Sequence, residues 1–290
     1  AGGTEVEPCA TRLVRFEAAG RHGGIAVSAP DSVLALATLF LHGWGALSPA
    51  RDSEVAVRCA HVTDGFDIAA SVLPGGRHRA ASAFEAADVV ASAVAALAIG
   101  GPEVILPHAA ALASPAGLVL LFADTTGGKS TLALTLAAAG WRLFGDDRLG
   151  LRRAPTGSVG VALGLAPKLR LPLPASAKAL SEFARKRVRQ SWPSLAYLQL
   201  APEEQAGPGT EAPVAACLLL DRGGGAPTLE PAHPARLVRA LAESAAAPWL
   251  APAEVMAAAA AHAGLPAFHL GYAEAAEAVP LLTERFGQSG

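Results

Sequence analysis

Hydrophobic and polar residues alternate in short runs near the N-terminus of the chain, whereas apolar runs dominate its later part. The runs TRLVRF (11–16) and SEVAVRCAHV (53–62) have the period of two that is typical of β-strands. Between them lies the apolar run VLALATLFL (33–41), which Asp31 and Ser32 could cap as a helix. Residues 1–80 are therefore expected to form short strands with one helix.

A second helix is predicted over SAFEAADVVASAVAALAIGG (82–101). Ser82 is a good N-cap, Glu85 follows three residues later as in a capping box, and two glycines close the segment. The pattern changes after this helix. We therefore expect an α+β accessory or substrate-recognition domain over 1–102 and a second domain over 103–290.

The second part of the chain alternates predicted strands and helices. EVILPHAAALA (103–113) predicts a strand that enters a loop, and GLVLLFA (117–123) is apolar throughout, as in a strand buried on both faces. A helix over 129–140, ended by Gly140, leads to a short strand WRLF (141–144). Further strands are expected in 148–174, 214–222 and 267–272, and further helices over 175–190, 233–245, 252–264 and 273–286. This order predicts an α/β fold with a mixed sheet flanked by helices.

Composition narrows the kinds of partner and compartment. The 290 residues carry a net charge of −2 and are 52% hydrophobic, so neither nucleic acid nor an anionic membrane is an expected partner. Pro107, His108 and Pro115 interrupt the uncharged segment 104–123, which argues against a membrane span. Three scattered cysteines fit a reducing cytoplasm. The sequence leaves open whether the protein is a homo-oligomer.

The segment FADTTGGKST (122–131) nearly matches the phosphate-binding loop G-x-x-x-x-G-K-[ST], with Ala123 in place of the first glycine. A buried strand, a glycine turn and a helix beginning at Lys129 supply inward N–H groups and a positive helix end for a polyphosphate. Lys129 would bridge the outer phosphates, and the Ser130 hydroxyl would bind Mg²⁺. The residues expected to bind the nucleotide are Asp124, Thr125, Thr126, Gly127, Gly128, Lys129, Ser130 and Thr131. The alternative is an ordinary strand–turn–helix.

Asp146 and Asp147 follow the short strand that comes after this helix. Adjacent carboxylates are costly unless a cation lies beside them, and a Mg²⁺ held by Ser130, Asp146 and Asp147 would supply that charge. The alternative is a solvated turn, since GDDR is also good turn chemistry.

The block LPHAAALASPAGLVLLFADTTGGKSTLALTLAAAGWRLFGDD resembles the core of the HPr kinase/phosphorylase family, whose P-loop fold is shared with phosphoenolpyruvate carboxykinases. The resemblance covers about 45 residues and includes the family's spacing of a histidine before the strand and an aspartate pair after the helix. It implies that Lys129 holds phosphate, that Asp147 accepts the proton of the substrate hydroxyl, and that Asp146 supports the metal or orients Asp147. It makes His108 an active-site partner of the aspartates.

The chain departs from the family in the run APKLRLPLP, which has Lys168 and Arg170 but lacks the further carboxylate of bifunctional members. We therefore do not expect HPr itself to be the acceptor. Lys168 and Arg170 alternate along a predicted strand and could clamp the transferring phosphoryl group. The alternative is a surface strand edge protected by a lysine.

The sequence thus predicts an ATP- and Mg²⁺-dependent kinase that phosphorylates a hydroxyl. Because some relatives belong to peptide-modifying pathways, the resemblance favours a serine of a protein or peptide, such as a ribosomal peptide precursor. One alternative is a small-molecule alcohol kinase of the same fold. Another is a nucleotide-binding regulator or scaffold without transfer activity.

Overall fold

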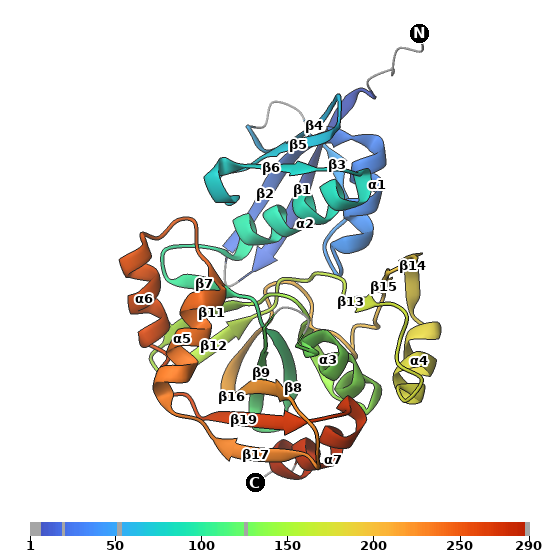
Figure 1. Ribbon diagram of the computed structural model, residues 1–290. Coiled ribbons are helices and arrows are strands. Elements are labelled where there is room, and N and C mark those ends of the chain that lie inside the picture. Colours follow the sequence, from blue (N-terminus) through green and yellow to red (C-terminus); the bar gives the residue numbers. More distant parts are fainter. Residues whose placement is uncertain (1–6, 19–20, 51–53, 125–126, 288–290) are drawn as a thin grey trace.

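The N-terminal part of the chain forms a six-stranded mixed sheet with two helices packed on one face (Figure 1). The computed structural model describes residues 7–18, 21–50, 54–124 and 127–287. The elements of this part are β1 (Cys9–Ala18), β2 (Arg21–Pro30), α1 (Asp31–Phe40), β3 (Ser48–Pro49), β4 (Val55–Val62), β5 (Gly65–Ala69), β6 (Arg77–Ala80) and α2 (Ala83–Ile99). The strand order is β3-β1-β2-β4-β5-β6, in which β2 and β4 are parallel and the other neighbours are antiparallel.

The two helices begin in different ways. The Glu85 backbone N–H donates to the Ser82 hydroxyl over 3.2 Å and the Glu85 carboxylate accepts from the Ala81 N–H over 2.9 Å, so the predicted cap of α2 is confirmed. The predicted capping of α1 by Asp31 and Ser32 is wrong. Both residues lie inside the first turn, and the Ser32 hydroxyl donates to the Glu7 carboxylate at 2.7 Å.

The second part of the chain forms a ten-stranded mixed sheet with helices on both faces (Figure 1). Its strands are β7 (Val104–Pro107), β8 (Ala110–Ser114), β9 (Gly117–Phe122), β10 (Arg142–Gly145), β11 (Gly150–Ala154), β12 (Gly157–Val161), β16 (Glu211–Arg222), β17 (Thr228–Pro231), β18 (Ala245–Ala246) and β19 (Ala267–Tyr272). One face packs against α3 (Lys129–Ala138) and α7 (Ala275–Phe286). The other packs against α5 (Pro234–Ser244) and α6 (Pro252–Ala260).

Strand β9 lies at the centre of this sheet and is buried on both faces, as its apolar run predicted. Val119 and Leu121 belong to the hydrophobic cluster under α3 and α7. Leu118, Leu120 and Phe122 belong to the cluster under α5 and α6. Because alternate side chains of β9 pack into the two hydrophobic clusters, the end of β9 is held on both faces. This fixes the position at which the loop after β9 begins.

A small third sheet lies beside α3. It consists of β13 (Lys168–Arg170), β15 (Leu195–Leu198) and β14 (Val188–Trp192) in that order, with α4 (Lys178–Arg185) next to them. The predicted helix over 175–190 is therefore wrong beyond Arg185. Pairing of β14 with β15, which a local pattern does not report, overrides the helical preference of this segment.

The two parts of the chain are joined by close contacts. The Ala166 N–H donates to the Phe40 carbonyl over 2.8 Å, and the rings of Phe40 and Tyr197 stack with centroids 4.1 Å apart. The hydrophobic cluster of the N-terminal sheet also includes Val104 and Leu163. The division into two domains at residue 102 stays a prediction. None of the described helices is both long enough and apolar enough to cross a membrane.

The buried histidine of the second part predicts a pH-dependent stability. His262 is 2% exposed, its Nδ1 lies 2.8 Å from the Ser158 hydroxyl, and burial together with Arg153 lowers its pKa to about 4. The unfolded chain, with a pKa of about 6.5, binds the proton more tightly, so stability should fall as pH drops below about 6.5 and level off below about 4.

Denaturant unfolding at about pH 8 and about pH 5 measures this effect. Between these two pH values, His262 should lower the free energy of unfolding by about 2 kcal/mol, and this decrease should be absent in His262→Gln. His22→Gln changes an exposed histidine and should keep the wild-type pH dependence. An unchanged pH dependence in His262→Gln would refute the assignment.

Candidate functional site

Strand direction brings the chemically active residues to one edge of the large sheet. Strands β9, β10, β16 and β19 run parallel, and β8 runs antiparallel between β10 and β9. The start of β8 therefore lies at the same edge as the ends of its neighbours. As a result His108, which precedes β8, lies near Asp124 after β9 and Asp146 after β10.

The glycine-rich loop, residues 123–128, connects β9 to α3. Gly128 has φ of +85°, and a Cβ there would lie 2.8 Å from Arg222 Cδ and 2.9 Å from the Tyr272 hydroxyl oxygen. Both the backbone conformation and the space at this position therefore require glycine. Lys129 is the first residue of α3 and is buried.

The space around Gly127 explains why Ala123 is tolerated. A Cβ on Gly127 would lie 2.8 Å from the Ala123 Cβ, so the two positions share room for one methyl group. The Gly127 N–H donates to the Asp124 carbonyl over 2.9 Å. Thr125 and Thr126, which the sequence also assigned to the nucleotide, lie outside the described residues.

A cleft of about 440 Å³, here called the central cleft, brings the other predicted residues together. Its predicted members are His108, Asp124, Gly127, Gly128, Lys129, Ser130, Thr131, Asp146, Asp147, Lys168 and Arg170. Leu195 and Arg222 also line it.

Asp146 is the most deeply buried acid of the cleft, with 4% of its surface exposed. Its Oδ2 accepts the Lys168 backbone N–H over 2.8 Å, while its Oδ1 is buried without a hydrogen-bond partner among the described residues. Burial raises the pKa of Asp146 to about 6; the charge of Asp147 adds to this, and the hydrogen bond from the Lys168 N–H together with the nearby Ser130 hydroxyl opposes it. A buried oxygen without a partner fits a bound cation.

The donor set suits Mg²⁺ bound with substrate. No group of three or more His, Cys, Asp or Glu side chains in the described ranges is placed to hold a metal. Mg²⁺ commonly uses one or two carboxylates together with phosphate oxygens and water. Ser130 and the Asp146–Asp147 pair offer such a partial set.

Asp147 differs from its neighbour in its surroundings. Its Oδ1 lies 2.9 Å from His108 Nε2, and its Oδ2 lies 3.9 Å from Lys168 Nζ. Although burial pushes the pKa of Asp147 upward, the hydrogen bond with His108 and the charges of Lys168 and Arg148 bring it below its usual value. Asp147 is therefore ionised at neutral pH, beside a carboxyl group that accepts a proton far more readily.

The pKa values of the two lysines of the cleft are shifted in opposite directions. Burial lowers the pKa of Lys129, and the carboxylates of Asp147 and Asp146 oppose this effect. Burial also disfavours the charged form of Lys168, but Asp88 and Asp147 together raise its pKa. Lys168 is thus a paired cation and not a solvated surface lysine, whereas Arg170 is exposed at the rim.

Four residues near the cleft were not predicted from the sequence: Asp88, Tyr197, Arg222 and Tyr272. Arg222 ends a strand parallel to β9, and ligands of α/β sheets gather at such carboxyl ends, so this position could have been found. Asp88 is an acid in a mostly apolar helix, which indicates a partner but does not identify it.

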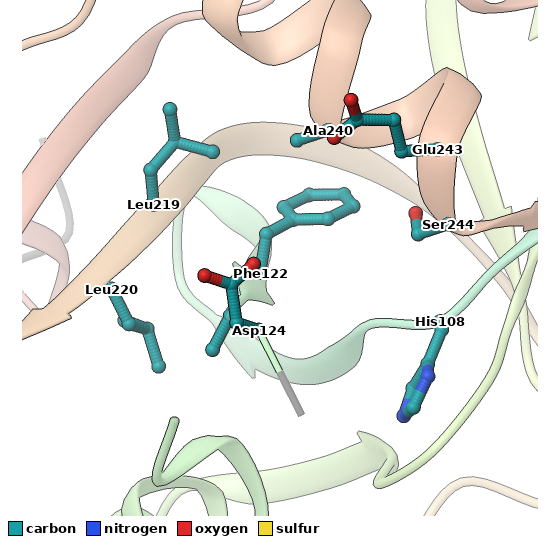
Figure 2. A pocket seen from close by; sticks show the side chains of 9 residues that line it. His108, Phe122, Asp124, Leu219, Leu220, Ala240, Glu243 and Ser244 are labelled. Carbon is teal, nitrogen blue, oxygen red and sulfur yellow. The ribbon is translucent and has the colours of Figure 1, made fainter. Parts of the chain in front are cut away.

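A second pocket, of about 300 Å³ and here called the His108 pocket, adjoins the central cleft (Figure 2). The two share His108 and Asp124. Figure 2 shows Phe122 and Asp124 at the end of β9, with Glu243 and Ser244 projecting from α5. A molecule in this pocket would lie beside the imidazole that contacts Asp147.

Comparisons with known proteins add little to this geometry. No protein-family model and no curated protein matches the chain. Among solved structures, the HPr(Ser) kinase/phosphatase from Coxiella burnetii matches at 14% identity over 62% of this chain and 91% of that chain, with a TM-score of 0.30. The sequence identity and the TM-score of this match are both low.

Substitutions of Gly128 and Gly140 can separate the effect of backbone strain at a positive φ from the effect of a steric clash in the cleft. Gly128→Ala should destabilise the protein by about 1 kcal/mol or more and abolish the nucleotide binding that the sequence predicts for this loop, because the new methyl group collides with Arg222 and Tyr272. Gly140→Ala is the matched control, since Gly140 also has a positive φ of +97° but open space around it. It should lose similar stability yet bind as the wild type does. Calorimetric titration with Mg²⁺–ATP measures both variants, and equal binding in both would contradict the assignment.

Proposed function

We propose that the protein is a kinase that transfers the γ-phosphoryl group of ATP, with Mg²⁺, to a hydroxyl group. The observation that carries this proposal is the ionised carboxylate of Asp147, held in the same cleft as Lys129 and the start of α3. A module that only bound nucleotide would need the lysine and the loop but not a base. Phosphoryl transfer needs both, since it depends on positioning, charge neutralisation and an acceptor for one proton.

The donor would be held by the loop and by α3. The N–H groups at the start of α3 and the Lys129 ammonium favour phosphate oxygens, and burial of Lys129 strengthens that attraction. Ser130, Asp146 and Asp147 would hold Mg²⁺, which supplies positive charge to the phosphates when bound. Lys168 and Arg170, on β13, add two cations to the same cleft.

The acceptor hydroxyl would meet Asp147. His108 fixes one carboxylate oxygen, and the other faces Lys168 at a longer distance. This arrangement orients the carboxylate, which takes the proton as the new bond to phosphorus forms. The lowered pKa keeps Asp147 ionised at neutral pH, and a weak base of this kind receives the proton late in phosphoryl transfer.

A further cavity next to Gly128 would take the nucleoside. It is lined by Gly128, Thr131, Thr135, Pro174, Ser176, Ala177, Lys178, Ala179, Leu180, Arg222, Tyr272, Glu274, Ala275 and Ala276. Arg222 and Tyr272 end the strands on the side of β9 away from β10, so the cavity and the aspartate pair flank the loop. The Tyr272 hydroxyl is buried without a hydrogen-bond partner in the described chain, as expected of a group that awaits a ligand.

The acceptor class follows from sequence and shape together. The family resemblance favours a serine of a protein or peptide other than HPr. The His108 pocket gives one observation in favour of a small-molecule alcohol, because about 300 Å³ beside His108, the partner of Asp147, is enough for a compact ligand.

Thermal unfolding with ATP, GTP or pyrophosphate, each with and without Mg²⁺, tests the proposal. We expect a Mg²⁺-dependent rise in unfolding temperature with ATP, because binding to the folded state stabilises it. If none of the three raises the unfolding temperature under either condition, the proposal is wrong.

Two substitutions separate binding from transfer. Lys129→Ala should abolish the ATP-dependent rise, since it removes the ammonium that faces the phosphates. Asp147→Asn keeps the shape of the side chain and should retain binding, yet slow phosphate release from Mg²⁺–ATP to water about 100-fold or more. A wild-type rate in Asp147→Asn would show that another group accepts the proton.

A further inference from the structure

Asp88 lies outside the large sheet but contacts Lys168, a residue of the central cleft. It is on α2, the helix that covers the N-terminal sheet, yet both of its carboxylate oxygens lie 2.9 Å from Lys168 Nζ. The Tyr197 hydroxyl donates to Asp88 Oδ1 over 3.0 Å. With 31% of its side chain exposed, Asp88 is directed by these contacts toward the second part of the chain.

Lys168 connects Asp88 to both aspartates of the cleft. Its ammonium lies 3.9 Å from Asp147 Oδ2, and its backbone N–H donates to Asp146 Oδ2 over 2.8 Å. The position of this one residue therefore sets the surroundings of both carboxylates. Asp88 contacts its charged end more closely than Asp147 does.

The distances indicate what Asp88 contributes. An ammonium released from Asp88 could form a direct ion pair with Asp147, which would engage the oxygen that a substrate hydroxyl needs. Held by two oxygens of Asp88, the ammonium remains close enough to favour the charge of Asp147 without occupying it.

We propose that Asp88 is a positioning residue that holds the Lys168 ammonium at its distance from Asp147, so that α2 and the N-terminal sheet are a working part of the active site. This inference rests on the proposed kinase function. It assigns the N-terminal part of the chain a direct effect on phosphoryl transfer, because a displacement of α2 would move Asp88 relative to the Lys168 ammonium.

Phosphate release from Mg²⁺–ATP to water, measured with the full chain, tests the inference. Asp88→Asn should lower the turnover rate about 10- to 100-fold, because a small misplacement of a catalytic group is costly, while the Kd for Mg²⁺–ATP stays within about two-fold. Glu85→Gln is the matched control. It makes the same change of charge one turn earlier on α2, keeps a residue suited to a capping box, and should turn over at the wild-type rate.

A double-mutant cycle distinguishes positioning from a general loss of structure. If Asp88 acts through Lys168, Asp88→Asn should have no further effect on turnover once Lys168→Gln is present. Independent, multiplying effects would overturn the inference.

Tyr197→Phe removes only the hydroxyl that contacts Asp88, so it should lower turnover less than Asp88→Asn. It decides the question if Asp88→Asn does not fold, and an unchanged rate in that variant would then count against the inference.

Failure of the inference differs from failure of the proposed function. If the wild type releases phosphate and Asp88→Asn equals Glu85→Gln, the function stands and the role of Asp88 falls. If the wild type neither binds Mg²⁺–ATP nor releases phosphate, both fall together.

Discussion

Two adjacent carboxylates at the end of a buried strand repel each other, and the candidate site gives them different surroundings and different affinities for a proton. Burial raises the pKa of Asp146 to about 6, although the Lys168 backbone N–H donates to its carboxylate. Asp147 has His108 and Lys168 beside it and stays ionised. A further cation would reduce the repulsion between the two carboxylates, which couples the proposed metal to the proposed donor.

The topology of the sheet explains why much of this site could be predicted from a short piece of sequence. His108, the glycine-rich loop and the aspartate pair lie at the ends of three neighbouring strands, β8, β9 and β10, within about 40 residues of chain. A short sequence pattern can predict this arrangement, because β9 and β10 end, and β8 begins, at the same edge of the large sheet. Ala123 is accommodated for an equally local reason, since Gly127 leaves room for its methyl group.

The sequence did not predict contacts that depend on distant pairing. Asp88 meets Lys168 across 80 residues of chain, and Tyr197 meets Asp88 across 109. The helix expected through residue 190 ends at Arg185 because β14 pairs with β15, and neither local propensity nor charge spacing encodes that partner. From the sequence, a residue such as Asp88 can be recognised only as an unusual acid in an apolar helix. Its partner, Lys168, can be identified only from the folded structure.

The packing around Tyr197 shows why α2 can act on the cleft instead of moving independently of it. The Tyr197 ring stacks on Phe40 of α1 and meets Phe84 of α2 edge to face at 5.5 Å, while its hydroxyl donates to Asp88. Shifting α2 would therefore disturb aromatic packing and a hydrogen bond in the same step. Because Tyr197 lies opposite Lys168 in the pairing of β13 with β15, the same strand pair carries the lysine and the residue that orients its partner. The distance from Lys168 to Asp147 is thus set by packing between the two parts of the chain.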